Sequence, residues 1–311
     1  MGLQAAAGEQ ISAGEPQPER GARSVWRRFQ RHPGARAGAI VFLILLIGIL
    51  LAPLSPYDPE ASSLPHRFRP PSLQHPMGTD ALGRDLLTRV LYGGRVSLTV
   101  GLLVVAITLT VGVTIGSLAG YWGGILDSIL MRITDTALAL PSLLVLVLMG
   151  AILRDIDLPL LKQNSVITIS IVIGILSWMT FARLVRASIL TLRELDFVTA
   201  ARAVGATPGR IIWRHILPNA IGPITVEATL ELGYAIIEES GLSFLGFGIQ
   251  PPTPSWGNLL SNAQENFLRY PWLAIFPGVM IFLTIISVNY VGDGLRDAFD
   301  PYKVLEQAGE V

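Results

Sequence analysis

The sequence predicts an all-helical membrane protein with six transmembrane helices and both termini in the cytoplasm. Two observations predict this fold class: the 311-residue chain is 51% hydrophobic but only 15% charged, and its uncharged residues gather in long runs. A soluble domain carries about 25% charged residues, so the shortfall argues against a soluble globular enzyme and against a disordered chain. Zero net charge gives no attraction to nucleic acid, and the absence of cysteine excludes disulfides and thiolate metal sites.

Five uncharged runs are each long enough to form a membrane-spanning helix, because about 20 residues cross the hydrocarbon core of a bilayer. One such run alone would also fit a buried core helix, but five in one chain favour a membrane protein. A sixth candidate at Ala220–Ile237 is weaker, because Glu227 and Glu231 interrupt it. The five runs are Ala37–Tyr57, Val96–Trp122, Thr136–Leu153, Gln163–Ala182 and Tyr270–Gly292.

The first run is expected to remain in the protein as a span. It follows 36 residues, and no small-residue cleavage site of a signal peptide comes promptly after it. The preceding segment is rich in Gly, Ala, Pro and Gln and becomes basic from Arg20 onward. We expect about the first 20 residues to be disordered.

The distribution of lysine and arginine sets the expected orientation, because these residues are enriched in cytoplasmic loops. With the N-terminus inside and six crossings, 15 of the 23 basic residues lie on the cytoplasmic side and 8 lie outside. A five-span alternative would put the C-terminus outside, and charge alone does not exclude it. The expected location is the cell membrane (inner or plasma membrane), crossed several times.

Four segments are expected along the chain. They are a cytoplasmic tail at 1–36, the first transmembrane helix with an extracytoplasmic loop and elbow at 37–96, a transmembrane domain of five helices at 97–297, and a cytoplasmic tail at 298–311.

In the outer loop, Gly78–Ser97 is predicted to form a lateral helix or elbow. Its charged residues are expected to pair at helical spacing, and they are Asp80, Arg84, Asp85 and Arg89.

The most informative stretch is the basic segment 183–219, which is expected to be exposed between two spans. Leu192–Val204 has the composition of a helix, and Gly205 is typical of a helix stop. Pro208 fits the first position of a second helix, which is expected to end at Pro218. The prediction is therefore two short helices joined by a tight turn.

Three interpretations of this segment compete. It is a plain connecting loop, a DNA-reading helix-turn-helix, or a docking knob for a cytoplasmic partner. The DNA-binding motif also uses a turn with glycine, but membrane spans on both sides would block docking on a duplex. We favour the knob, because the small side chains of Ala200 and Ala201 let a partner approach the backbone closely while nearby arginines pair with acidic groups.

The small residues and prolines of this segment follow a specific spacing, with Ala200, Ala201, Gly205, Leu217 and Pro218 at its defining positions. This pattern resembles the cytoplasmic "EAA" loop of ABC importer permeases. Thr199 departs from it, because the motif has Glu there. The ending His-x-Leu-Pro-Asn resembles the peptide and nickel branch of that family. The resemblance implies that the segment couples to an ATPase through Ala200, Ala201, Gly205, Ala206, Pro208, His215, Leu217, Pro218 and Asn219.

Two further stretches resemble the same family. His75–Leu98 is similar to the segment after the first span in C-type permeases of dipeptide and oligopeptide importers, and Leu242–Gly257 is similar to their outer segment after the fifth span. The likeness covers roughly residues 25–300. It implies the type I ABC importer permease fold, and it favours the weak sixth span.

The lysine count predicts that this chain has no phosphate-binding loop, so if transport is driven by ATP, hydrolysis must occur on another polypeptide. A phosphate-binding loop needs the pattern G-x-x-x-x-G-K-[ST], but the only lysines, Lys162 and Lys303, lie in other contexts. The resemblance then implies a non-catalytic subunit without a cofactor or metal of its own, with ATP and Mg²⁺ bound by partner subunits. The resemblance implies two ATP-binding subunits, a second permease subunit forming a heterodimer, and an extracytoplasmic substrate-binding protein.

Three glutamates lie in the weak span. Glu227, Glu231 and Glu238 fall within about 40° on one helical face. Because charge inside a bilayer is costly, such a stripe should face the protein interior or a wet cavity. Either the carboxylates pair with arginines or lie near helix ends, or they line the path of a cationic group such as a peptide amino terminus.

Several functions remain in competition. The favoured one is a permease subunit for dipeptides or oligopeptides, and the nearest alternative is another cargo of the same branch, such as a nickel chelate, glutathione or an oligosaccharide. A proton-coupled secondary transporter would use the glutamate stripe, but no convincing inverted repeat is present. An intramembrane hydrolase is disfavoured, because the sequence has neither G-x-S-x-G nor H-E-x-x-H.

Overall fold

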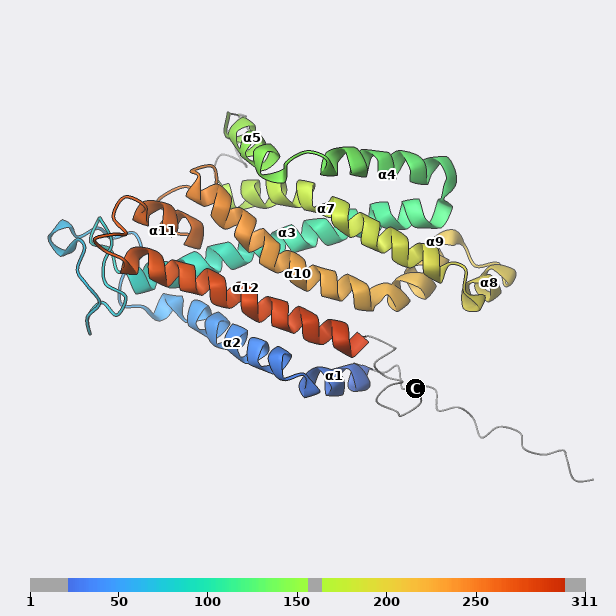
Figure 1. Cartoon of the computed structure of the whole chain (residues 1–311), viewed down its shortest axis with the longest axis horizontal. Coiled ribbons are helices and arrows are strands. Elements are labelled where there is room, and N and C mark those ends of the chain that lie inside the picture. The colour runs from blue at the N-terminus through green and yellow to red at the C-terminus, as the bar shows by residue number, and fades with distance from the viewer. Residues whose placement is uncertain (1–21, 156–163, 300–311) are drawn as a thin grey trace, which may run out of the picture.

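The computed structural model describes residues 22–155 and 164–299 as a bundle of long, roughly antiparallel helices (Figure 1). The expected disorder of the first 20 residues lies outside this range. The long helices are α2 (Pro33–Leu50), α3 (Leu86–Trp122), α4 (Gly124–Leu138), α5 (Ser142–Asp155), α7 (Ser165–Leu192), α10 (Leu217–Phe244) and α12 (Trp272–Phe299). Short helices are α1 (Ala22–Arg31), α8 (Asp196–Ala203), α9 (Pro208–Ile211) and α11 (Trp256–Ala263).

The predicted all-helical, membrane-spanning fold class is confirmed. Five helical stretches in the described part of the chain are long and apolar enough to cross a membrane, and the bent pair α4–α5 makes a sixth when counted as one span. The weak candidate at Ala220–Ile237 lies inside α10, so its glutamates did not prevent a membrane-length helix.

The third uncharged run does not form the single straight helix that its length predicted. Thr136–Leu153 is divided between α4 and α5, whose axes differ by 89°. Pro141 lies at the break. Proline lacks a backbone N–H and clashes with the preceding turn, so the chain bends there. This span is a broken helix, either crossing in two pieces or entering as a re-entrant loop.

Both described ends of the chain lie at the same end of the bundle, as six crossings require (Figure 1). Helix α2 begins behind an N-cap in which His32 Nδ1 accepts a hydrogen bond from the Ala35 amide at 3.0 Å. It then packs along α12, where a Cβ on Gly38 would lie 2.7 Å from the Ser287 carbonyl. The Arg28 guanidinium of α1 donates to the Ala298 carbonyl at 3.1 Å.

The centre of the bundle is the close pairing of α3 with α7. Gly112, Gly116 and Gly120 repeat every four residues on the face of α3 that meets α7. A Cβ added at Gly116 would lie 2.5 Å from the Ala182 carbonyl. Small residues let two helix backbones approach, which is the main way helices gain packing energy inside a membrane.

The outer loop differs from the predicted lateral helix. Helix α3 begins at Leu86 behind the N-cap Asp85 and runs straight through to Trp122, while residues 78–85 form tight turns. Asp80 accepts from the Arg84 side chain at 2.7 Å and lies 3.5 Å from the Arg89 guanidinium. The expected pairing of Asp80 with arginine therefore occurs, but a turn provides it.

A second network fixes α11 to the outer end of the bundle. The buried carboxylate of Glu239 accepts from the Ser97 hydroxyl of α3 at 2.9 Å and from the Ser243 hydroxyl at 2.7 Å. Ser255 and Asn258 form a capping box at the start of α11. The fully buried Trp256 donates its indole N–H to the Val90 carbonyl at 2.9 Å. These contacts explain why polar residues recur in the two outer motifs: they hold the loops onto α3 and α10.

Candidate functional site

The basic segment forms the helix, turn and helix that the sequence predicted, at the end of the bundle that holds the described chain termini (Figure 1). Helix α8 ends in a Schellman motif: the Gly205 amide bonds the Arg202 carbonyl at 2.9 Å, and the Ala206 amide bonds the Ala201 carbonyl at 3.0 Å. Gly205 has a φ of 81°, a conformation that glycine adopts without a steric penalty.

The second helix does not end at Pro218 as expected. Helix α9 continues through a π-helical turn at Ile212–Ile216 directly into α10, and Pro218 lies in the first turn of α10. Proline lacks a backbone N–H, and Pro218 follows directly after the π-helical turn, where the regular i→i−4 hydrogen-bond ladder is already interrupted. The Asn219 side chain donates to the His215 carbonyl at 2.6 Å. The coupling motif is thereby continuous with a membrane span.

The predicted coupling residues gather on one surface, although not all point outward. Ala200, Gly205, Pro208, Pro218 and Asn219 are exposed, and so is Thr199 at the position where the motif has Glu. Ala206 and His215 are half-buried, whereas Ala201 and Leu217 are buried. A shallow groove beside the turn is lined by Ala201, Val204, Ala206, Arg210, Arg214 and His215.

Apolar packing fixes this surface to the spans. Ala201 and Val198 of α8 are buried in one cluster with Phe181, Val185 and Ile189 of α7. Ile211, Ile212, Ile216, Leu217, Ala220 and Ile224 complete the cluster from α9, the π turn and α10. Because buried side chains pack as densely as a crystal, this cluster joins α8 closely to both spans.

Sequence reasoning missed the residues that join this segment to α4. It placed Arg183 and Arg186 in a cytoplasmic loop, but both lie inside α7 and pair with acidic residues of α4. Those acidic residues are Asp127, which follows the second uncharged run, and Asp135, which directly precedes the third. One signal for this was present in the sequence: Arg183 and Arg186 are three residues apart, a spacing that places both side chains on the same face of a helix.

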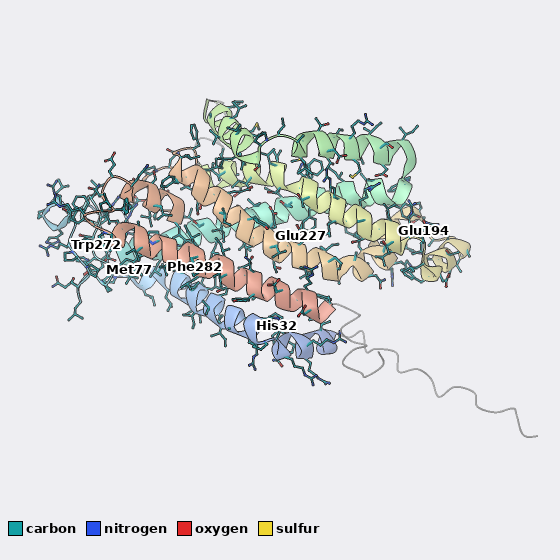
Figure 2. The ribbon with its side chains drawn as sticks, viewed as in Figure 1. His32, Met77, Glu194, Glu227, Trp272 and Phe282 are labelled. Carbon is teal, nitrogen blue, oxygen red and sulfur yellow. The ribbon has the colours of Figure 1, made fainter. Side chains whose placement is uncertain are left out.

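The three glutamates lie along one face of α10, from the middle of the helix toward its C-terminal end. Figure 2 labels Glu227 between Glu194, near one end of the bundle, and Trp272, near the other. Glu227 and Glu238 are half-buried, while Glu231 is 8% exposed and its Oε1 has no hydrogen-bond partner in the described part of the chain. Tyr234 falls on the same face and is 61% exposed. This face of α10 is therefore only partly covered by the chain's own described helices.

A bundle of membrane-length helices that carries an exposed helix, turn and helix at one end is the arrangement that the resemblance to ABC importer permeases implied. The family described as binding-protein-dependent transport system inner membrane component matches residues 112–303. The family described as the N-terminal TM domain of oligopeptide transport permease C matches residues 22–71.

Known relatives agree over nearly the whole chain. The dipeptide transport system permease protein of Alkalihalophilus pseudofirmus is 43% identical, with 90% of this chain and 89% of the relative covered. The glutathione transport system permease protein of Pectobacterium atrosepticum is 40% identical, with 90% of each covered. The di/tripeptide transport system permease protein of Pseudomonas aeruginosa is 40% identical, with 89% of this chain and 90% of the relative covered.

The fold is shared with a solved structure of an inward-facing MetNI methionine ABC transporter. Its TM-score is 0.53 at 20% identity, with 68% of this chain and 96% of that chain covered.

The chain thus belongs to the family of binding-protein-dependent transport system inner membrane components. It is a multi-pass protein of the inner membrane and a non-catalytic permease subunit, for which no cofactor of its own is expected. A member of this family works with ATPase subunits and a binding protein.

Proposed function

We propose that this chain forms part of the translocation path of an ABC importer for dipeptides or oligopeptides, paired with a second permease subunit. Relatives named for dipeptide and di/tripeptide transport, 43% and 40% identical over about nine-tenths of the chain, support this cargo. Glutathione is itself a small peptide, so the glutathione permease supports the same cargo class. Nickel chelates and oligosaccharides remain the alternative cargoes of the branch.

The coupling residues are assigned to the surface of α8 and α9. The observation that carries this assignment is an exposed turn, built on Gly205, whose apolar underside is buried against two spans. ATP binding closes the ATPase pair and pushes on the turn, and α7 and α10 move with it to open the path outward. Hydrolysis returns the inward-open state, so this chain contributes the two-state element and its partners contribute the chemistry.

A reconstituted importer tests both the assignment of the cargo and the assignment of the coupling residues. The chain with its partner permease, ATPases and binding protein should accumulate a labelled dipeptide in proteoliposomes only with ATP, and vanadate should stop uptake. Ala200→Leu and Gly205→Val should leave basal ATP hydrolysis intact but lower uptake about tenfold or more, as a lost coupling of about 1.4 kcal/mol would. Ala187→Leu, an exposed alanine of α7 outside the turn, serves as the matched control.

Normal uptake by both coupling variants would contradict the coupling assignment. Uptake of a nickel chelate or an oligosaccharide in place of peptides would contradict the cargo while leaving the coupling intact. Uptake driven by a proton gradient in the absence of ATP would identify a secondary transporter.

We also propose that Glu227, Glu231 and Glu238 line the path. Support comes from the shared face of α10, on which Glu227 and Glu238 are half-buried and Tyr234 is 61% exposed. Glu231 is buried on the same face, and its Oε1 has no hydrogen-bond partner in the described part of the chain. A second permease subunit beside α10 would enclose the stripe, and the carboxylates would then attract the amino terminus of a peptide. We also propose that the chain is divided into the four segments 1–36, 37–96, 97–297 and 298–311.

A further inference from the structure

Two arginines of α7 and the arginine that caps its C-terminal end contact the hairpin formed by α3 and α4. The Arg193 guanidinium donates to the Gly120 carbonyl at 2.8 Å, near the C-terminal end of α3. Arg186 binds both carboxylate oxygens of Asp127, at 2.5 and 2.6 Å. Arg183 forms an ion pair with Asp135, two turns further along α4. We call Arg183, Arg186 and Arg193, together with their partners on the hairpin, the arginine clasp.

Helix α4 has little else to attach it. Thr134 is its one buried residue, and its apolar side chains Ile125, Ile129 and Ile133 are at least half exposed. Interior packing usually holds a helix in place, and here that packing is sparse. The attachment of α4 to the bundle therefore depends on polar contacts to an unusual degree.

The Arg186–Asp127 pair is the strongest member of the clasp. The side chains are 32% and 16% exposed, whereas those of Arg183 and Asp135 are 48% and 62% exposed. A bidentate arginine–carboxylate pair fixes direction as well as distance, and partial burial reduces its screening by salt and water. An open pair such as Arg183–Asp135 contributes little by comparison.

The junction of α3 and α4 also contacts α8, the helix that ends at the Gly205 turn, which we call the coupling turn. Arg202 of α8 lies over the Tyr121 ring, with its guanidinium carbon 5.7 Å from the ring centroid. Tyr121 packs against the apolar cluster that anchors α8 and α9. The end of α3 and the start of α4 thus contact α7 through two arginines and α8 through a third.

We propose that the arginine clasp carries the α3–α4 hairpin along when the coupling turn moves, so that the bent α4–α5 span changes position in step with α7. This proposal rests on the coupling function proposed above and names the residues that extend it to α4. The arginines are positioning residues, because they act through the helices and touch neither cargo nor ATP. Without the clasp, α7 and α10 would still follow the ATPases while α4 would lag behind.

Reciprocal charge exchange tests the clasp in the complete reconstituted importer. Arg186→Asp and Asp127→Arg should each lower ATP-driven peptide uptake about tenfold or more, a coupling loss of typical allosteric size, while ATP hydrolysis persists and loses its stimulation by the binding protein. The double variant restores a pair of opposite charges. It should recover uptake and stimulation to within about threefold of the parent, as expected for two residues that interact directly.

Arg132→Asp is the matched control, because Arg132 lies exposed on α4 and forms no ion pair in the described part of the chain. It should leave uptake unchanged. A double variant no better than the single variants, in assembly or in uptake, overturns the proposal. So does normal stimulated uptake in both single variants. The Gly205→Val importer, measured in parallel, separates a failure of the clasp from a failure of the coupling turn itself.

Discussion

At the scale of residues, the structure gives a physical reason for glycine at position 205 and distinguishes two buried glutamates of α10 by their hydrogen-bond partners. A Cβ added at Gly205 would meet open space, so the requirement for glycine is conformational: a φ of 81° suits glycine and strains other residues. Glu231 and Glu239 are both buried in α10 but differ in partners. Glu239 is satisfied by the hydroxyls of Ser97 and Ser243, whereas one oxygen of Glu231 has none in the described residues. Glu239 therefore joins helices through its hydrogen bonds, whereas Glu231 keeps one buried oxygen without such a bond.

The glutamate stripe gives a prediction at this scale. Replacing Glu227 and Glu231 together by Gln should reduce peptide uptake at limiting cargo several-fold, because a neutral amide attracts a peptide amino terminus less than a carboxylate does. Initial uptake rates across cargo concentrations measure the effect, which should appear mainly as weaker apparent affinity. Glu239→Gln should instead impair assembly, since it disturbs the network that holds α11.

Unchanged uptake by the Glu227→Gln, Glu231→Gln importer, with normal assembly, would show that these carboxylates do not line the path. A copurified ATPase pair and a normal elution profile establish assembly.

At the scale of helices, backbone approach and proline placement determine the arrangement. The glycine row of α3 lets α7 approach, and the turn at Pro141 divides the third span. Pro218 does not end the helix as its residue type suggested, because it follows the π-helical turn at Ile212–Ile216, where the regular hydrogen-bond ladder is already interrupted, and the helical path continues into α10. The position of a proline along a helix, more than its presence, decides whether the helix continues.

The glycine row gives a prediction at this scale. Gly116→Ala should destabilise the subunit by about 1–3 kcal/mol, because its Cβ would lie 2.5 Å from a backbone carbonyl that is held in α7. A lower thermal unfolding midpoint of the purified importer in detergent is the expected readout. Gly278→Ala, where a Cβ meets nothing within 4 Å, is the control and should leave the midpoint nearly unchanged. Equal midpoints for both variants would contradict the packing argument.

At the scale of the whole molecule, charge and motif place the two ends on opposite sides of the membrane. The basic coupling turn lies at the end that holds α1 and the end of α12, and the proline-rich loop with α11 lies at the other (Figure 1). Both described ends of the chain can lie on the same side only if the chain crosses the membrane an even number of times. The bent α4–α5 pair must therefore count as one span.

The absence of cysteine makes this arrangement directly testable. Val204→Cys and Leu73→Cys place single thiols at residues that are 84% and 104% exposed. A membrane-impermeant maleimide should label Leu73→Cys in intact spheroplasts, and it should label Val204→Cys only after permeabilisation. Labelling of both from the same side would contradict the six-span arrangement.

The sequence by itself determined the membrane class, most span positions, the Gly205 turn and the family. These follow from local properties: hydropathy over about 20 residues, a glycine conformation and motif spacing. The pairing of Asp80 with Arg84 was also foreseen, although a turn and not a helix brings them together.

Only the structure showed how sharply the third span bends at Pro141, that α9 continues into α10, and which residues the arginines in α7 contact. Arg186 and Asp127 are 59 residues apart in the chain. No local pattern brings them together, because their contact depends on how closely the glycines of α3 let α7 approach. The sequence therefore located the surface that we propose couples to the ATPases, and the packing of helices distant in sequence decided which spans are joined to it.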